Sequence, residues 1–399
     1  MNSPLHVAVI GGGAAGFFAA ITAASGGHRV TLFERSNKVL AKVKVSGGGR
    51  CNVTHACSSP SALSKHYPRG EKQLRKAFGR FAVNDTVAWF GERGVELKTE
   101  DDGRMFPVTD SSQTIIDCLE AAAREAGVRV VLQRPVAALE PVEGGWHVDG
   151  ARFDRVVVAT GGSPKREGLA WLERLGHGLA DPVPSLFTFN LPGEGIRRLM
   201  GVVVPSAIVR IQGTKLQEQG PVLVTHWGLS GPAVLKLSAW GARELADRGY
   251  AFTVQVNWVG ERNEEAVQAT LQGAAAEHAR KQVGNACPFE LPRKFWAYVL
   301  ERAGIEGERT WADLARKQRN KLVDTLLNDT YPVRGKTTFK EEFVTCGGVL
   351  RSDVDFATMQ SRVAPGLYFA GEVLDIDGVT GGFNFQAAWT TGFIAGQLA

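Results

Sequence analysis

Three glycine-rich stretches contain residue types suited to contact with a phosphate-bearing ligand. The first has the G-x-G-x-x-G spacing at Gly11, Gly13 and Gly16. It follows the apolar run 6–10 and opens a run of small residues, the strand-to-helix context in which this spacing binds a dinucleotide. In such a turn the first glycine permits the bend, the second lets a pyrophosphate approach, and the third allows close helix packing. The helix N-terminus offers unpaired N–H groups to the phosphates, so the sequence predicts a dinucleotide site.

An acidic residue stands where the ribose of such a ligand would lie. Glu34 ends the apolar run 29–34, 23 residues after Gly11. A carboxylate there can accept hydrogen bonds from both ribose hydroxyls. It would also repel a 2′-phosphate, which favours FAD or NAD over NADP. The choice between FAD and NAD must come from elsewhere in the chain.

The other two stretches lie far apart in the sequence. Residues 42–54 place Ser46, three glycines, Arg50, Cys51 and Asn52 together, a set with many hydrogen-bonding groups and little bulk. A solvated surface loop is the alternative interpretation of this segment. Residues 371–386 repeat the order of strand, acidic loop and helix start, which again forms a backbone cradle for an anion.

These segments require an α/β framework to hold them. The pattern predicts a βαβ unit with buried parallel strands at 6–10 and 29–34 around a helix at 14–25, a helix at 113–126, and further strands at 128–132 and 155–159. From 186 to 260 the chain is β-rich, with strands expected at 186–191, 202–211, 222–225 and 251–258. Helices are expected at 264–282, 291–303 and 312–328, then strands at 342–345 and 366–372 and a final helix. We predict a Rossmann-like domain over 1–185 and 336–399, interrupted by an inserted domain over 186–335 that is β-rich to 260 and helical over 261–330.

Composition limits the class of protein. The chain has 399 residues, of which 47 are glycine and 17 proline, and 44 % are hydrophobic, so collagen and a disordered chain are excluded. Five scattered cysteines do not resemble a secreted disulfide framework, and we expect a cytoplasmic protein. The uncharged stretch 7–25 lacks a preceding positive region and contains adjacent glycines, so neither a signal peptide nor a membrane span is expected.

The three stretches together resemble the two-dinucleotide-binding-domain flavoproteins. Within them the chain is similar to the bacterial FAD-binding oxidoreductases of the aminoacetone oxidase and bile-acid (3-dehydro-4,6-steroid) reductase types. The similarity rests on Ser46-Gly-Gly-Gly-Arg-Cys-Asn52, on 225–232 (THWGLSGP), and on 371–378 (GEVLDIDG) with 380–386 (TGGFNFQ), and it covers nearly the whole chain.

The resemblance implies a site for FAD. Gly11, Gly13, Ala14 and Ala15 are expected at the pyrophosphate, Glu34 and Arg35 at the adenosine end, Val136 at adenine, Thr160 and Gly161 beside the dinucleotide, and Gly371 and Glu372 near the ribityl phosphate. Backbone amides at Phe383, Asn384 and Phe385 are expected at the flavin pyrimidine edge, where they stabilise negative charge on a reduced flavin. The remaining candidates for cofactor contact are Lys42, Ser46, Gly47, Arg50, Cys51, Asn52, Asp375 and Gly382. Phe383 and Phe385 stand where relatives often carry Tyr and Leu.

Catalytic residues are harder to predict. Cys51 and Cys57 lie near where disulfide reductases carry a redox pair, but five residues intervene, so a working disulfide is not expected and Cys51 is interpreted as a bystander in the flavin pocket. His226 could donate a proton to a substrate; a histidine that only stabilises the 225–232 turn is the alternative. Cys51, His226 and Asn52 are therefore only weak catalytic candidates, and no residue cluster has metal-ligand spacing.

The lack of a second dinucleotide motif and the arrangement of the basic residues limit the partners that we expect. No second G-x-G-x-x-G occurs over 185–335, so NAD(P)H would have to dock directly at the flavin, unless the substrate is itself the reductant. Basic runs at 69–80 and 316–321 suggest RNA, but the first is spaced as one helical face and no aromatic residues are interleaved, so a nucleic acid is not expected. We predict an FAD-dependent oxidoreductase that transfers hydride to or from a small organic substrate. A flavin-dependent tRNA-modifying protein and a non-catalytic flavin redox sensor are the alternatives.

Overall fold

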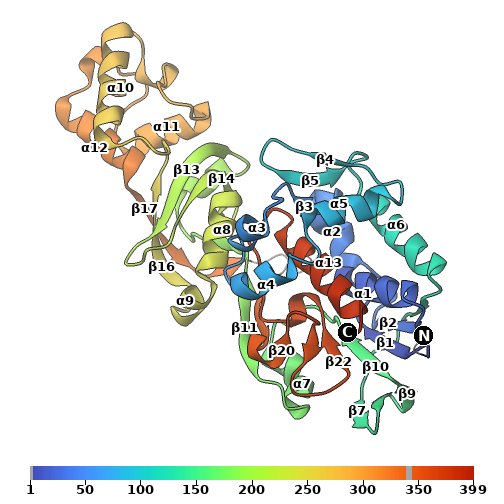
Figure 1. The fold of residues 1–399 in the computed structure, drawn as a ribbon. Helices are drawn as coiled ribbons and strands as arrows, with labels where there is room; N and C mark the ends of the chain where they lie inside the picture. Colours follow the sequence, from blue (N-terminus) through green and yellow to red (C-terminus); the bar gives the residue numbers. More distant parts are fainter. Residues whose placement is uncertain (1–2, 338–343) are drawn as a thin grey trace. The chain divides into compact units, whose positions relative to one another are not determined.

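The chain divides into two compact units. The computed structural model describes residues 3–337 and 344–399. Unit 1 comprises Met1–Ser185 and Phe339–Ala399, and unit 2 comprises Leu186–Thr338 (Figure 1). Both ends of the chain thus contribute to unit 1.

Unit 1 is built on a mainly parallel sheet. Its described strands follow the order β20-β21-β22-β10-β1-β2-β6. Their bounds are β1 His6–Ile10, β2 Arg29–Phe33, β6 Arg129–Val131, β10 Arg155–Val158, β20 Val354–Asp355, β21 Gln360–Ser361 and β22 Leu367–Phe369. The β1 strand lies between β10 and β2, with Val7 opposite both Arg155 and Val30, and both pairings are parallel. The predicted α/β fold class is confirmed.

Unit 1 contains the helices α1 Ala14–Ser25, α2 Ala41–Gly49, α3 Pro60–Ser64, α4 Glu71–Ala77, α5 Val83–Gly91, α6 Ser112–Glu125, α7 Ala170–Arg174 and α13 Phe383–Gly396. Of these, α1 and α13 pack against the parallel sheet. The α1 and α13 helices pack closely (Figure 1), because glycines remove side chains from their contact. A Cβ at Gly392 would lie 2.5 Å from the carbonyl oxygen of Ala15, and one at Gly396 would lie 2.5 Å from that of Ala19. This match of 392 with 15 and 396 with 19 shows that the two helices run parallel.

Three smaller sheets complete unit 1, and sequence patterns did not predict the two made of short strands. These comprise β3 Thr54–His55, β4 Leu97–Thr99 and β5 Arg104–Pro107, and β7 Leu139–Val142, β8 Gly145–Val148 and β9 Ala151–Phe153. The third pairs β11 Leu179–Ser185 with β19 Val344–Val349 in antiparallel fashion. The strand predicted at 342–345 is therefore seen from 344 onward, and its first two residues lie outside the described ranges.

Unit 2 combines an antiparallel sheet with helices. Its described strands follow the order β17-β16-β13-β14-β15-β12-β18. The elements are β12 Thr188–Asn190, β13 Val203–Ile211, β14 Gln217–Val224, β15 Gly228–Ser230, β16 Ala251–Asn257, β17 Asp329–Arg334, β18 Lys336–Thr337, α8 Pro232–Trp240, α9 Ala242–Asp247, α10 Glu264–Glu277, α11 Arg293–Arg302 and α12 Arg316–Leu327. The helix predicted at 264–282 ends early, at Glu277, and the helix predicted at 312–328 covers only Arg316–Leu327.

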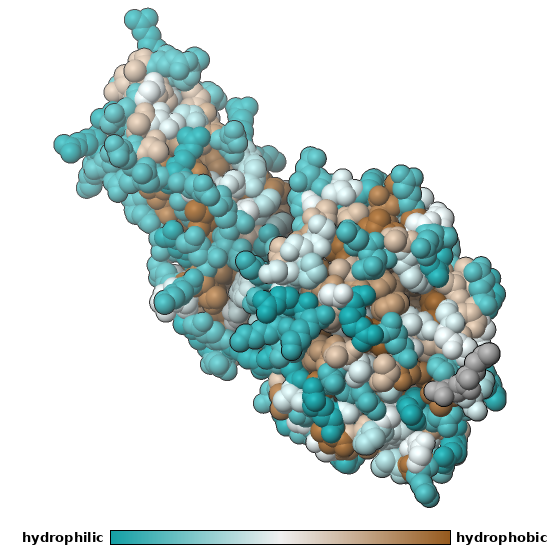
Figure 2. All heavy atoms as spheres, viewed as in Figure 1, coloured by the Kyte–Doolittle hydropathy of each residue, from teal (hydrophilic) through white to brown (hydrophobic). Residues whose placement is uncertain are grey.

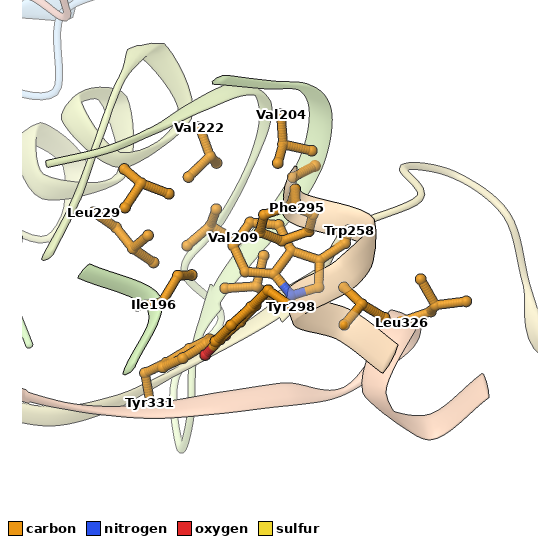
Figure 3. Packing of buried hydrophobic residues seen from close by; sticks show 14 of the residues in the cluster. Ile196, Val204, Val209, Val222, Leu229, Trp258, Phe295, Tyr298, Leu326 and Tyr331 are labelled. Carbon is orange, nitrogen blue, oxygen red and sulfur yellow. The ribbon is translucent and has the colours of Figure 1, made fainter. Parts of the chain in front are cut away.

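A buried carboxylate ties the helices of unit 2 to its sheet. The hydrophobic core includes Trp258 and Tyr331, both fully buried (Figure 3). Beside these two rings, Asp329 accepts hydrogen bonds from Trp258 Nε1 at 3.0 Å, from Arg302 Nε at 2.6 Å and from the hydroxyl of Tyr331. The burial of Tyr331 beside this carboxylate raises the pKa of its phenol, so the hydroxyl stays protonated and remains a donor.

No helix among the described residues is long and apolar enough to cross a membrane.

Candidate functional site

The β1–α1 turn has one crowded and one open glycine. Gly11 has φ +113°, and a Cβ there would lie 2.3 Å from the carbonyl oxygen of Ala159, so only glycine fits this turn. A Cβ at Gly13 would meet no heavy atom of the described chain within 4 Å. Beside it, the N–H groups of the first turn of α1 begin at Ala14 and Ala15 and have no partner within the helix. The turn therefore leaves a backbone surface open to an anion.

Glu34 is fixed at the edge of this turn. Its carboxylate accepts hydrogen bonds from the backbone N–H of Gly12 and of Ser36, each at 2.8 Å. The carbonyl of Glu34 accepts from the N–H of Arg134 at 2.9 Å, which brings the segment leading to Val136 alongside. The Arg35 side chain is exposed. The predicted adenosine-side residues thus lie at one end of the sheet.

The second glycine stretch forms α2 and a break within it. Ser46 leaves the helical conformation, and Gly47, Gly48 and Gly49 have φ values of 58°, 69° and 86°. A Cβ at Gly48 or Gly49 would meet no described atom within 4 Å. The segment is therefore not a regular helix. It presents bare backbone, which is why the run contains only glycine here.

Cys51 is sequestered behind this backbone. It is fully buried, and burial raises the pKa of its thiol to about 12. Cys57 is partly exposed, and both thiols are free. A thiol with this pKa carries almost no thiolate at neutral pH, which disfavours redox or nucleophilic chemistry at Cys51. This supports the interpretation of Cys51 as a bystander.

The C-terminal acidic loop meets the same region. Glu372 pairs with Lys42 Nζ at 2.8 Å and accepts the backbone N–H of Thr345 at 2.7 Å. The Thr345 hydroxyl is buried without a hydrogen-bond partner among the described residues. A Cβ at Gly162 would lie 2.4 Å from that hydroxyl, whereas Gly161, at φ +74°, faces open space as Gly13 does. The predicted contacts Lys42, Gly161 and Glu372 are thereby brought together, with Thr160 exposed next to them.

The start of α13 is held by side chains from both ends of the chain. With its amide oriented so that both groups are paired, Asn52 accepts the N–H of Gly382 at 3.0 Å and donates to the carbonyl of Thr54 at 2.9 Å. The Asn384 side chain accepts from and donates to the backbone of Gly378 at 2.8 and 2.9 Å. As at any helix start, the first-turn N–H groups of Phe383, Asn384 and Phe385 have no intrahelical acceptors.

The parallel packing of α1 and α13 separates their two N-termini. Gly392 lies opposite Ala15, so the start of α1 at Ala14 lies level with Thr391, and α13 begins about 12 Å before that point. Both helix ends carry partial positive charge and point the same way. An elongated ligand with an anionic group at each of two positions fits this arrangement.

Two histidines that sequence reasoning missed enclose the first residue of α13. The Phe383 ring stacks on His66 at 4.3 Å and on His55 at 4.6 Å between centroids. The His55 ring also lies 3.0 Å, through Nδ1, from the carbonyl of Gly381. Their positions in the chain, 55, 66 and 383, gave no signal because only the tertiary fold brings them together. They add two titratable groups to the predicted flavin end.

Two predicted cofactor residues are instead engaged by ion pairs. The Arg50 guanidinium pairs with Glu100 at 2.5 Å and lies 4.0 Å over the ring of Phe106. The buried Asp375 pairs with Arg351 at 3.2 Å. These contacts give both residues a structural role, and their contact with a cofactor stays a prediction.

The basic run 69–80 contains both exposed and buried side chains. Lys72, Arg75 and Lys76 are exposed on α4, but Arg69 is largely buried and pairs with Asp377. Burial raises the pKa of Asp377, while Arg69 and the Ser185 hydroxyl, which donates at 2.8 Å, oppose that change.

In unit 2 the structure places His226 in an exposed turn. Its carbonyl accepts from Arg197 Nε at 2.7 Å, and its ring lies 4.2 Å from that of Trp227. A role in proton transfer stays a prediction. A cleft of about 590 Å³ in unit 2, lined by Ser206, Trp258, Arg262, Asn263 and Phe289 among others, contains none of the residues predicted for the site.

The residues present fit a dinucleotide cofactor. The open backbone at Gly13 and Gly161 and the Thr345 hydroxyl, which has no partner among the described residues, are features that packing within the described part of the chain does not use. The Glu34 carboxylate is held beside them by the N–H groups of Gly12 and Ser36. Assignment of individual residues to parts of FAD stays a prediction.

Comparison with known proteins places this geometry in context. The family model described as HI0933-like protein Rossmann domain matches residues 5–398. A 3-dehydro-bile acid delta(4,6)-reductase of Clostridium scindens is 28 % identical, over 99 % of this chain and 98 % of that protein. A ribosomal RNA dihydrouridine synthase of Escherichia coli is 30 % identical, over 98 % of this chain and 96 % of that protein.

Solved structures agree at the level of the fold. The 3-ketosteroid-delta4-(5alpha)-dehydrogenase of Rhodococcus jostii has a TM-score of 0.51 at 14 % identity, covering 98 % of this chain and 97 % of its own. The 3-ketosteroid delta1-dehydrogenase of Sterolibacterium denitrificans has a TM-score of 0.50 at 14 % identity, covering 99 % of both chains.

Fold, site and relatives define an oxidoreductase of the Rossmann type that uses FAD. Within that class, the chain belongs to the HI0933-like protein Rossmann domain family. The predicted resemblance and the predicted cofactor are confirmed.

Proposed function

We propose that this protein is an NAD(P)H-dependent reductase that saturates a carbon–carbon double bond conjugated to a carbonyl group in a small organic substrate. The observation that supports this most is a bond type shared by two relatives that match nearly the whole chain. A 3-dehydro bile acid with delta(4,6) unsaturation is a conjugated dienone. Dihydrouridine forms from uridine by saturation of a double bond conjugated to the ring carbonyl.

The reaction requires that hydride reach the β-carbon of the conjugated system and that a proton reach the α-carbon. FAD supplies the hydride chemistry when bound. The first-turn N–H groups at Phe383, Asn384 and Phe385 would stabilise negative charge at that end of the site. Asn52 and Asn384 hold this backbone in place, so the N–H groups need no rearrangement during reaction.

The reductant is proposed to dock without a domain of its own. Unit 2 contains no second G-x-G-x-x-G over 186–338. Its sheet is antiparallel, whereas the dinucleotide fold needs parallel strands joined by helices. NAD(P)H would therefore reach the flavin directly.

Anaerobic mixing of the purified flavoprotein with NADH or NADPH tests this function. We expect one of them to bleach the visible flavin absorption band, and a cyclic enone to restore it with formation of the saturated ketone. The saturated ketone itself is the control and should not reoxidise the flavin. Failure of both nucleotides to reduce the flavin would contradict the proposal and favour the redox sensor or a substrate-reduced oxidase.

A second candidate substrate is uracil within RNA. One observation favours it: unit 2 carries 20 Lys and Arg against 15 Asp and Glu, while unit 1 is balanced at 26 of each. Reoxidation of the reduced enzyme by a uridine-containing RNA, with dihydrouridine detected by mass spectrometry of the digested product, would support this substrate. A small enone that turns over while RNA does not would support the first candidate.

A further inference from the structure

The net positive charge of the chain is confined to part of unit 2. Residues 278–321 contain ten Lys and Arg against five Asp and Glu, a surplus equal to the +5 of the whole chain. The stretch begins just after α10 and ends inside α12. Positive charge is therefore concentrated in the helical part of unit 2 and absent, on balance, from unit 1.

The start of α12 has charges that oppose the helix dipole. Its first turn holds Arg316, Lys317 and Arg319, and no acidic residue. The start of α10, in the same unit, follows the usual rule, with an Asn263 cap and Glu264 and Glu265 in its first turn. Cations at a helix N-terminus are unfavourable because that end of the helix carries partial positive charge. Nothing in the fold of α12 explains their presence, whereas an anionic partner would.

Backbone pairing brings two more cations to this helix end. The N–H of Trp311 donates to the carbonyl of Lys281 at 3.1 Å, and that of Ala312 donates to the carbonyl of Ala279 at 3.0 Å. Residues 279–281 therefore lie against 311–312, four residues before α12 begins. Arg280 and Lys281 are exposed there. We call Arg280, Lys281, Arg316, Lys317 and Arg319 the α12 cationic cluster.

Among the residues that the structure describes, the members of this cluster have no carboxylate partner. Within the described ranges none of the five has an Asp or Glu oxygen within 4.0 Å, whereas Arg198, Arg248 and Arg302 of the same unit are all paired. Two acidic residues near the cluster have other partners. Asp313 accepts a hydrogen bond from the Thr310 hydroxyl at 2.6 Å, and Glu306 lies 3.7 Å from Arg309. Figure 2 shows a largely hydrophilic surface over this helical part.

Among the described residues around this cluster, no exposed aromatic ring is suited to stacking on bases. Trp311 is fully buried, and the exposed tryptophans Trp227 and Trp240 lie on other segments of unit 2. Single-stranded nucleic acid is usually held by such rings, while double-helical RNA is recognised by its backbone and shape. The chemistry therefore suits a row of phosphates more than unpaired bases.

We propose that the α12 cationic cluster binds the phosphate backbone of double-helical RNA. This proposal rests on the second substrate candidate above, and it assigns RNA docking to unit 2. Each phosphate contact contributes about −0.9 to the slope of log K against log salt concentration, so five contacts predict a slope of about −4.5. Little dependence on base sequence is expected, because phosphates carry no sequence information.

Binding of a short fluorescein-labelled RNA hairpin, followed by anisotropy across a salt series, tests the proposal. The variant R316Q/K317Q/R319Q should reduce the slope by about 2.7 and weaken binding at least tenfold at low salt. The control R198Q/K215Q/R248Q removes the same net charge from unit 2 but leaves the cluster intact. It should bind the hairpin within about twofold of the unmodified protein, since nonspecific loss of charge has only a small, screened effect. Circular dichroism and flavin content verify that both variants fold.

Three outcomes would overturn the proposal: equal loss of binding in both variants, a salt slope unchanged by R316Q/K317Q/R319Q, or tighter binding to phosphatidylglycerol vesicles or polyglutamate than to the hairpin. Flavin reduction by NAD(P)H and enone turnover are measured on the same samples. If these persist while hairpin binding is absent, the inference fails and the reductase function stands. If the hairpin binds but no flavin is reduced, the function fails and the docking surface stands.

Discussion

The open position at Gly13 provides the sharpest test of where the cofactor lies. We predict that Gly13→Ala weakens FAD binding without unfolding the protein. The backbone at Gly13 has φ −91°, which alanine adopts without strain, and the added Cβ would meet no described atom within 4 Å. The change therefore costs the apoprotein at most about 1 kcal/mol, the value of a poorer helix cap.

The cost appears when FAD binds. A methyl group on a surface that a pyrophosphate must contact acts as overpacking, which costs about 1–3 kcal/mol. This corresponds to a roughly 5- to 150-fold increase in the dissociation constant for FAD. Titration of FAD into the deflavinated protein, followed by calorimetry, measures this change, and thermal unfolding of the apoprotein measures stability.

Two matched substitutions separate the local causes. Gly11→Ala places its Cβ 2.3 Å from a carbonyl oxygen at a positive φ, so it should destabilise the apoprotein itself by more than about 2 kcal/mol. Gly91→Ala, at the end of α5, adds the same methyl where no described atom lies within 4 Å, and it should leave FAD affinity unchanged. If Gly13→Ala bound FAD as tightly as Gly91→Ala, or unfolded as readily as Gly11→Ala, the placement of the pyrophosphate would be wrong.

Three further predictions concern buried groups. Asp329→Ala should lower the free energy of unfolding by about 3–5 kcal/mol in urea titrations, because Arg302 loses its buried partner. Asp324, which pairs with Lys321 at the surface, offers a control. Its change to alanine should lower the free energy of unfolding by less than about 1 kcal/mol. Burial lowers the pKa of His177, whose Nε2 lies 2.7 Å from the Ser361 hydroxyl. The unfolded state therefore binds more protons than the folded state below about pH 6.5. The free energy of unfolding should fall as pH decreases through that value, by at most about 1.4 kcal/mol per pH unit. His177→Gln should flatten this slope in unfolding measured by fluorescence, and an unchanged slope would show that another group titrates. Cys51, with a pKa of about 12, should resist iodoacetamide at neutral pH while Cys57 reacts, as peptide mass mapping would show; equal labelling would contradict the burial argument.

The parts of the fold that local sequence determines could be predicted. The β1 strand and the α1 helix have the bounds expected from the apolar run and the glycine turn, because both signals lie within adjacent residues. The strand β10 was also expected within one residue. The strands β3 and β9 have only two and three residues, too short to show a period, and they form by pairing with distant segments.

The candidate site also has a part that could be predicted from the sequence and a part that could not. The glycine motifs and Glu34 could be predicted because each carries its geometry locally. The stack of His55, Phe383 and His66 could not, since it joins residues more than 300 positions apart. The ion pair between Arg50 and Glu100 could not be predicted either, because only the pairing of β3 with β5 brings their segments together. Pairwise contacts of this kind leave no pattern in one sequence.

The parallel contact between α1 and α13 has a consequence for biosynthesis. The ribosome completes α1 early, but about 360 residues must be added before α13 emerges to cover it. At ~5–20 residues per second this takes roughly 20–70 s. During that interval the apolar face of α1, including Phe17 and Phe18, lacks its final neighbour. Unit 2 emerges complete before the last helix of unit 1, so the part of the predicted cofactor site at the start of α13 forms only after unit 2 has been synthesised.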